Sequence, residues 1–385
     1  MSLRRRLALV VVTLPVAFYA YACSSDPEAG PTADPDSGPP INGDDSSTGS
    51  DTSTNNDGSM PGVDASDGAV AVTCIGNPLV PDGGSPDGGV NVAAGETTQI
   101  VTPAGTPFID GPHWVDALGG FLVYSEYEPT EQVHRIGVAG GTPTSFRTAG
   151  FSDTLGPVGN TVRNGMVVTA VSAKDPGATA LFLVSNPDGG AAGTIAVGGG
   201  STAPNDLVAG PGNNIFFTDG QYQGPAGTAG LYRILGDGGI VSVEQNIGRA
   251  NGIALSADNT KLYVGVGPLV GEVADPKAVR VYNVAATGAV TAPGAVFLAA
   301  ADLADVPDGI AIDVGGNLWI AEAEGTGAAS GRVEVFSPAK KRLGTIIFTN
   351  QRPTGIAFGG TDGKTVFITT QTGVWKYASR CAGVK

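Results

Sequence analysis

The chain is poor in the residues that build metal clusters and long helices. Its 385 residues include only three cysteines and two histidines, too few soft ligands for a zinc cluster or an iron–sulfur centre. Charged residues make up 15% of the chain, which argues against coiled coils and long solvated helices. A net charge of −15 disfavours binding to nucleic acid or to anionic lipids. Glycine and proline are abundant, with 60 and 27 residues, and 41% apolar residues still allow a packed core in which they form turns.

The N-terminus is typical of an export signal. Arginines at 4–6 precede an apolar run from Leu7 to Ala22, which is short for a bilayer span and suits a signal peptide. Because small residues precede Cys23, the region resembles a bacterial lipoprotein signal in which residues 1–22 are removed and Cys23 is lipidated. An ordinary secretory signal cleaved nearby is the alternative. The resemblance implies an outer-membrane-anchored lipoprotein, periplasmic or on the cell surface, that meets the membrane only through its lipid.

Residues 23–73 are predicted to be a disordered acidic tether. Between residues 24 and 72 the sequence has ten acidic residues, no lysine or arginine, and almost no large apolar side chains. Such a segment cannot bury enough apolar surface to offset the entropy lost on ordering. The folded domain is therefore predicted to span residues 74–385.

A strand–turn–strand unit recurs along that domain. Clear copies run from Asn205 to Asp219, from Asn251 to Gly265 and from Asp308 to Glu322, each with two apolar runs around a turn rich in Gly, Pro or Asn. The six units start at 110, 155, 205, 251, 308 and 354. β units repeated every 40 to 50 residues or so are typical of propellers, so we predict an all-β, six-bladed β-propeller. A β-sandwich or two smaller β domains would not explain six evenly spaced units.

Two cysteines lie near the ends of this domain. Cys74 precedes the first predicted strand, and Cys381 lies close to the end of the chain. In an exported protein such a pair is predicted to form a disulfide that holds the first and last blades together, and two free thiols are the alternative.

The unit starts are expected to meet at one mouth of the propeller, because the innermost strand of every blade runs along the central channel. Four of the six starting residues carry a carboxylate or amide oxygen. Oxygen ligands without His or Cys suit a hard cation, so Ca²⁺ is favoured and Mg²⁺, Mn²⁺ or Zn²⁺ are alternatives. The six positions are Asp110, Leu155, Asn205, Asn251, Asp308 and Thr354.

Other polar residues are predicted near the same mouth. Glu126, Asp219 and Glu322 end the returning strands and are predicted to bind substrate, or else simply to end those strands. His113 follows Gly111-Pro112 and is predicted near the mouth, where it would bind substrate or act as an acid or base, with a packed or hydrogen-bonded core histidine as the alternative.

The motifs resemble the senescence marker protein/gluconolactonase/regucalcin family of six-bladed propellers over roughly residues 110–377. The resemblance is strongest around Pro204-Asn205-Asp206, Ala250-Asn251-Gly252 and Pro307-Asp308-Gly309. In that family a Glu-Gly-Pro motif, two asparagines and the Asp of Pro-Asp-Gly hold one divalent metal. Carried over by motif, the ligands are Asp110, Asn205, Asn251 and Asp308.

The resemblance implies a hydrolase that opens a lactone or a related ester. In that reaction the cation polarises the carbonyl, and Asp308 orients or deprotonates the attacking water. Two residues depart from the family pattern. Asp110 is one methylene shorter than the usual Glu, for which Glu126 is a hypothetical supplement, and Ala203 stands where many sugar lactonases have an Arg.

These departures favour a lactone other than gluconolactone and leave a second function open. The alternative is a non-catalytic cell-envelope propeller that binds a ligand, peptide or glycan at its mouth. A strictosidine-synthase-like propeller fits the asparagine and aspartate ring less well. The enzyme is expected to act on a small molecule as a monomer, without nucleic acid.

Overall fold

The computed structural model describes residues 107–221, 229–268, 277–324 and 330–384, together with 74, 77–79, 90–92, 96–103 and 105. The predicted signal peptide, Cys23 and the predicted tether lie outside these residues. Within the described ranges the only helical turns are two short 3-10 turns, Ala117–Gly119 and Pro211–Asn213. No helix of those ranges is long and apolar enough to cross a lipid bilayer.

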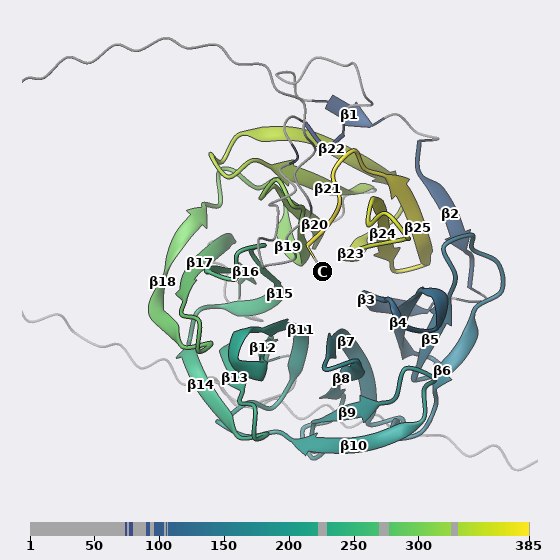
Figure 1. Ribbon diagram of the computed structural model, residues 1–385, viewed down its shortest axis with the longest axis vertical. Helices are drawn as coiled ribbons and strands as arrows, with labels where there is room; N and C mark the ends of the chain where they lie inside the picture. Colours follow the sequence, from purple (N-terminus) through teal and green to yellow (C-terminus); the bar gives the residue numbers. More distant parts are fainter. Residues whose placement is uncertain are drawn as a thin grey trace, which may run out of the picture. The chain divides into compact units, whose positions relative to one another are not determined.

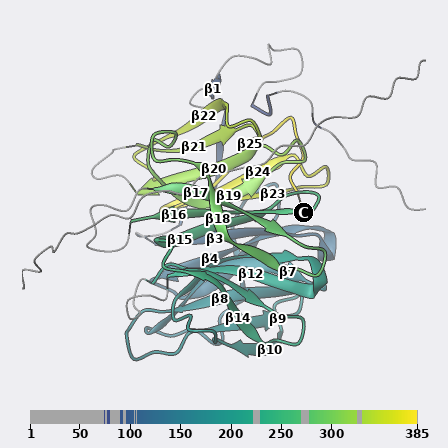
Figure 2. The ribbon, with the colours of Figure 1, turned by 90° about the vertical axis from the view of Figure 1, so that its left-hand side faces the viewer.

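Six sheets surround a central axis, and each sheet forms one blade (Figure 1). Every blade is an antiparallel meander whose first strand lies innermost, and Figure 2 gives the same sheets from the side. The predicted six-bladed β-propeller is therefore confirmed. The strands are β3 (Phe108–Val115), β4 (Phe121–Glu128), β5 (Gln132–Ile136) and β6 (Thr144–Arg147) in blade 1; β7 (Leu155–Arg163), β8 (Met166–Ala173), β9 (Leu181–Ser185) and β10 (Ala191–Ala196) in blade 2; β11 (Pro204–Gly210), β12 (Asn214–Asp219), β13 (Gly230–Ile234) and β14 (Ile240–Gln245) in blade 3; β15 (Arg249–Leu255), β16 (Lys261–Gly267), β17 (Ala278–Val284) and β18 (Val290–Leu298) in blade 4; β19 (Val306–Ile312), β20 (Leu318–Glu324), β21 (Ser330–Phe336) and β22 (Arg342–Thr349) in blade 5; and β23 (Pro353–Gly359), β24 (Thr365–Thr370) and β25 (Gly373–Ala378) in blade 6.

The hydrophobic core lies between neighbouring blades. Strands β12 and β16 read as nearly continuous apolar runs because both faces of each sheet pack against another sheet. Between blades 2 and 3, for example, the rings of Phe182 and Phe217 meet edge to face at 4.8 Å, and Phe217 stacks on Tyr232 at 5.3 Å. Burying each such ring stabilises the fold by about 1.5–3 kcal/mol.

Two strands from the N-terminal side of the domain complete the last two blades. Strand β2 (Thr98–Val101) pairs antiparallel with β25 as the outer strand of blade 6. Strand β1 (Val90–Val92) pairs parallel with β22 at the edge of blade 5. The ring is thus closed by chain that precedes blade 1, a feature that the repeat pattern did not predict.

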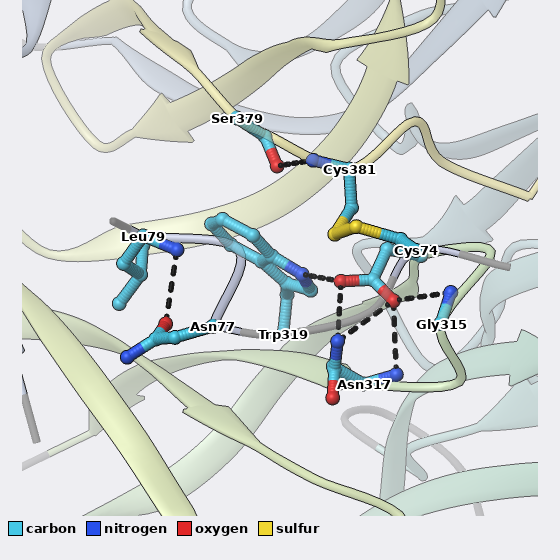
Figure 3. The surroundings of a disulfide bond; sticks show 9 residues. Cys74, Asn77, Leu79, Gly315, Asn317, Trp319, Ser379 and Cys381 are labelled. Carbon is cyan, nitrogen blue, oxygen red and sulfur yellow. Dashed lines mark hydrogen bonds between the residues drawn. A yellow bond between two sulfur atoms is a disulfide. The ribbon is translucent and has the colours of Figure 1, made fainter. Parts of the chain in front are cut away.

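A disulfide and a buried segment add to this closure. Cys74 and Cys381 form a disulfide, with their Cα atoms 5.5 Å apart and a sequence separation of 307 (Figure 3). Leu79 is buried in the core shared by blades 5 and 6, and its carbonyl accepts a hydrogen bond from the Tyr377 hydroxyl at 3.0 Å. Asn77 donates to the Leu343 carbonyl at 2.8 Å. These contacts tie the segment before blade 1 to the end of the chain.

Each inner strand carries a β-bulge near the mouth, and the bulges show which residues are equivalent. In blades 1, 3, 4 and 5, the inner-strand residue that pairs with the mouth residue of the second strand is followed directly by a predicted metal ligand. The paired residues are Ile109, Pro204, Ala250 and Pro307. In blade 2 the residue in that place is Val158, because Pro157 pairs with Val171 and the bulge follows. The predicted ring position Leu155 is therefore wrong by three residues. Strand β7 begins earlier than its counterparts, and the apolar Val158 gave no polar motif to mark the position.

The residue after the ring position is a glycine in five of the six blades, and these glycines set the spacing between inner strands. A Cβ on Gly252 would lie 2.0 Å from the Asp308 carbonyl oxygen, and one on Gly159 would lie 2.5 Å from the Asn205 carbonyl oxygen. The inner strands therefore touch backbone to backbone, which no residue with a side chain would allow without movement. The five positions, called here the glycine ring, are Gly111, Gly159, Gly252, Gly309 and Gly355.

We expect the disulfide to contribute stability in proportion to the long loop that it closes. The double variant Cys74→Ser/Cys381→Ser should lose roughly 3–5 kcal/mol of unfolding free energy in the chain-entropy account, measured by chemical denaturation. Cys23→Ser, which leaves the pair intact, is the control. Equal stability of the double variant and the wild type would contradict a role of the disulfide in holding the ring closed.

We expect Gly252→Ala to push blades 4 and 5 apart, because its methyl group would occupy the place of the Asp308 carbonyl. Overpacking of this kind costs roughly 1–3 kcal/mol of unfolding free energy. Thermal unfolding measures the loss, and Gly193→Ala, where no atom lies within 4 Å of the added carbon, is the control. A Gly252→Ala protein as stable as the control would refute this account of the ring.

Candidate active site

Four buried oxygen donors occupy equivalent positions at one end of the central channel. Each comes from a different inner strand, and the bulges place all four at the same level of the ring. Two are carboxylates and two are amides, and each is at most 8% exposed. The donors, called here the mouth ring, are Asp110, Asn205, Asn251 and Asp308. The remaining ring positions, Val158 and Thr354, carry a methyl-rich side chain and a hydroxyl that donates to the Ile109 carbonyl at 2.7 Å.

Hydrogen bonds between blades fix the level of the ring. The Thr218 hydroxyl donates to the Asn251 carbonyl at 2.6 Å and accepts from the Asp206 amide at 3.1 Å, which links blade 3 to blade 4. Asn160 donates to the Gly111 carbonyl at 2.7 Å and links blade 2 to blade 1. Because these bonds are buried, they are costly to break, and they hold neighbouring ring positions in register.

The Asn205 side chain has an unsatisfied oxygen. Its Oδ1 atom is buried and has no hydrogen-bond partner among the described residues. A buried acceptor without a donor costs about 1–3 kcal/mol, so its presence calls for a ligand. A hard cation would satisfy such an oxygen, and the all-oxygen donor set of the mouth ring fits one. No cluster of three or more His, Cys, Asp or Glu side chains suited to a metal occurs among the described residues, and the ring itself counts two amides among its four donors.

A further carboxylate, that of Asp206, lies in blade 3 at the position where each of the other five blades contributes one residue of the glycine ring. Burial and the nearby Asp110 charge raise the pKa of Asp206 to about 8, and burial raises the pKa of Asp110 to about 6. Both residues line the same cavity. The sequence analysis missed Asp206. An alignment of the six repeats would have shown it, because five repeats have Gly at this position and one has Asp.

The central channel holds a cavity of about 390 Å³ that begins at Asp110 and Asp206. Its walls are largely apolar, and Val384 lines it together with Ile312 and Phe358. Val384 donates its backbone amide to the Ile312 carbonyl at 2.9 Å, so the C-terminal segment runs beside the end of β19, near the centre of the ring (Figure 1).

His113 lies in the wall of this cavity, and its role in substrate binding stays a prediction. Burial lowers its pKa to about 4, against the smaller opposing effect of the Asp116 charge. The imidazole is therefore neutral at neutral pH. His134, by contrast, stacks on Tyr124 at 5.1 Å in the outer part of blade 1.

The three carboxylates predicted to bind substrate lie at or within two residues of the mouth ends of their strands, but each contacts the protein itself. Glu126 Oε2 lies 2.8 Å from His134 Nε2. Asp219 Oδ2 accepts from the Thr202 and Ala203 amides at 2.7 and 3.0 Å. Glu322 Oε2 accepts from the Asp305 amide at 2.9 Å. None of the three lines the cavity described above, and their substrate-binding role stays a prediction.

Glu322 also belongs to a buried pair of carboxyl groups. Burial and the Glu334 charge raise the pKa of Glu322 to about 8. Burial raises the pKa of Glu334 as well, although Arg342 Nη2 lies 3.4 Å from its Oε2 atom and opposes that shift. The pair therefore retains a proton at neutral pH, which limits the repulsion between the two groups.

Comparison with known proteins by sequence finds lactonases. A gluconolactonase from Zymomonas mobilis is 26% identical over 295 residues, which cover 71% of this chain and 79% of that protein. Pentonolactonase XacC from Haloferax volcanii is 30% identical over 174 residues, 44% of this chain and 53% of its own, so this chain spans about half the length of that relative.

Comparison of folds finds propellers of the same architecture. A gluconolactonase from Xanthomonas campestris superimposes with a TM-score of 0.57 at 23% identity, covering 74% of this chain and 89% of that one. Regucalcin from Agrobacterium tumefaciens, described as a calcium-binding protein, gives 0.55 at 14% identity, with 72% and 91% covered. At these identities the likeness establishes the fold alone.

The family model described as "SMP-30/Gluconolactonase/LRE-like region" matches residues 110–372, from the first mouth-ring residue to the turn after β24. This range contains most of β3, the other five inner strands and all four oxygen donors. The chain belongs to the SMP-30/gluconolactonase/LRE-like family.

Proposed function

We propose that the protein is a metal-dependent lactonase that opens a lactone or a related ester at the mouth ring. The observation that carries this proposal is the set of four buried oxygen donors at equivalent positions of four inner strands, one of them unsatisfied. Family membership supports it, as do the names of the sequence relatives, a gluconolactonase and a pentonolactonase.

Asp110, Asn205, Asn251 and Asp308 would hold one divalent cation. The two carboxylates would balance its charge, and four oxygen ligands favour Ca²⁺, with Mg²⁺, Mn²⁺ or Zn²⁺ as alternatives. When bound, the cation supplies electrophilic polarisation of the substrate carbonyl.

The protein's own residues would direct the water. Asp308 is the carboxylate that orients the attacking water and accepts its proton at a carboxylate oxygen. The water oxygen bonds to the carbonyl carbon, the ring C–O bond breaks, and the leaving alkoxide takes up a proton to give a hydroxy acid. The channel below the ring is lined largely by apolar side chains and by the neutral His113, together with the carboxyl groups of Asp110, Asp116 and Asp206.

The site favours a lactone less polar than a sugar lactone. Ala203, which stands where many sugar lactonases have an Arg, is fully buried and offers no cation to a substrate hydroxyl. A non-catalytic role, in which the mouth binds a ligand, peptide or glycan, is the alternative outcome of the tests below.

We further propose that the protein is exported and anchored through lipidated Cys23, as a monomer. A Cys23→Ser variant expressed in a Gram-negative host should move from the membrane fraction to the soluble fraction, because its acyl chains would be lost. An unchanged membrane fraction would argue against the anchor.

The metal requirement is tested with the purified protein. Chelation should abolish hydrolysis of small lactones, and added Ca²⁺ should restore it. Asn251→Ala should weaken Ca²⁺ binding, because it removes one of four ligands, and Asp308→Ala should lower kcat by roughly 10²–10⁴-fold.

Val158→Ala is the matched control, since Val158 occupies a ring position without a donor atom and should leave the Ca²⁺ affinity unchanged. A protein that binds no divalent cation and hydrolyses neither lactones nor aryl esters would overturn the proposal in favour of the binding role.

A further inference from the structure

The residues at the mouth ends of the second strands occupy equivalent positions, yet only some make contacts beyond their own strand pair. Each pairs with the residue just before a mouth-ring position. Three of the six are acidic and three are not. In blade order they are Glu126, Val171, Asp219, Val266, Glu322 and Thr370.

Asp219 holds the segment that leads into Asn205. Its Oδ2 atom accepts hydrogen bonds from the Thr202 amide at 2.7 Å, the Ala203 amide at 3.0 Å and the Ser201 hydroxyl at 2.8 Å. Its Oδ1 atom accepts from the Gln221 amide at 2.7 Å. The side chain is fully buried, so these charge-assisted bonds are not weakened by water.

Glu322 makes the corresponding contact in blade 5. Its Oε2 atom accepts from the Asp305 amide at 2.9 Å, and the residue is 1% exposed. Asp305 precedes Asp308 by three residues, and Thr202 precedes Asn205 by three residues. Two different side chains, from strands of two different blades, therefore fix the same backbone amide relative to a mouth-ring donor.

These two contacts occur where a proline directly precedes a candidate metal ligand. Pro204 and Pro307 come immediately before Asn205 and Asp308, and proline has no backbone N–H to donate to the neighbouring strand. The β-bulge then interrupts the strand pairing at the ligands Asn205 and Asp308 themselves. Proline alone does not bring the contact, because Pro157 and Pro353 take the same place in blades 2 and 6, where the mouth residues are Val171 and Thr370. The ring residues of those two blades, Val158 and Thr354, are not candidate ligands. In blade 4 the residue before Asn251 is Ala250, which retains its N–H, and the equivalent mouth residue is the apolar Val266.

Glu126 shows that an acidic residue at this position does not always bind the backbone that precedes the mouth-ring ligand. In blade 1 the residue before Asp110 is Ile109, which also retains its N–H. There the Glu126 carboxylate lies against His134 of the next strand. Hydrogen bonds from His134 and Thr130 lower the pKa of Glu126 although burial opposes them.

We infer that Asp219 and Glu322 are positioning residues of the mouth ring, which fix the backbone before Asn205 and Asp308, and that neither binds substrate. The inference rests on the proposed function, because it concerns how that site holds its cation. Both residues would act on the cation indirectly, by positioning its ligands Asn205 and Asp308.

The test is Ca²⁺ binding to the purified, metal-stripped protein, measured by calorimetry. Asp219→Asn should raise the Ca²⁺ dissociation constant by roughly 10- to 100-fold, the usual cost of losing a group that orients a metal ligand. Glu322→Met, which keeps the volume but removes the acceptor for the Asp305 amide, should act in the same direction. At saturating Ca²⁺ both variants should retain the wild-type KM for lactone.

Asp313→Asn is the matched control. Asp313 is also fully buried, and it accepts from the Gly315 and Asn317 amides at 2.9 and 3.0 Å and from Trp319 Nε1 at 3.2 Å, but it follows the opposite end of β19. This substitution should lower the unfolding temperature and leave the Ca²⁺ dissociation constant unchanged. The comparison separates loss of a buried carboxylate from loss of ligand positioning.

Each outcome decides between the proposals. Wild-type Ca²⁺ affinity in folded Asp219→Asn and Glu322→Met proteins, or a raised KM with unchanged Ca²⁺ affinity, would overturn the positioning role and leave the lactonase proposal standing. If Asp219→Asn does not fold, Glu322→Met alone decides. A wild-type protein that binds no divalent cation would overturn both proposals.

Discussion

Close contact between the backbones of neighbouring inner strands is the constraint on which the rest of the structure depends. At the glycine ring the carbonyl of one blade fills the space where the preceding blade would carry a Cβ atom, as between Asp308 and Gly252. This contact sets the diameter of the channel mouth. It therefore also sets how near to one another the donors of four separate blades can lie. A ring of larger residues would still be a propeller, but its donors would be spread more widely.

Such a ring is useful only if it stays closed, and closure is built from the two ends of the domain. Strand β2 completes blade 6, Leu79 enters the core of blades 5 and 6, and the disulfide joins Cys74 to Cys381. Ring closure and donor spacing are therefore linked, because separation of blades 6 and 1 would release the contact between Gly355 and Pro112 at the mouth. The blades near the closure carry Asp110 and Asp308. The two asparagines, Asn205 and Asn251, lie in blades 3 and 4 and are held mainly by contacts among blades 2 to 5.

The sequence predicted the fold because the repeats carry both the turn residues and the apolar runs of each blade. The same repeats located Asn205, Asn251 and Asp308, since a polar residue before Gly or Asp marks each bulge. Blade 2 was misplaced because Val158 resembles any buried strand residue. The closing strands were missed because β1 and β2 have three and four residues and no repeat partner. The contacts of Asp219 and Glu322 could not be predicted, because a carboxylate at a strand end faces either solvent or a neighbouring loop, and only the folded loop decides which.

The ring position occupied by Val158, which has no side-chain oxygen, has an evolutionary consequence. Val158 is followed by a glycine that admits the next blade, so its surroundings already match those of the donor positions. Valine codons differ from those of aspartate and glutamate at the second base alone. One point mutation could thus place a third carboxylate at the mouth ring, and natural selection could alter the charge and ion preference of such a centre without redesigning the scaffold around it.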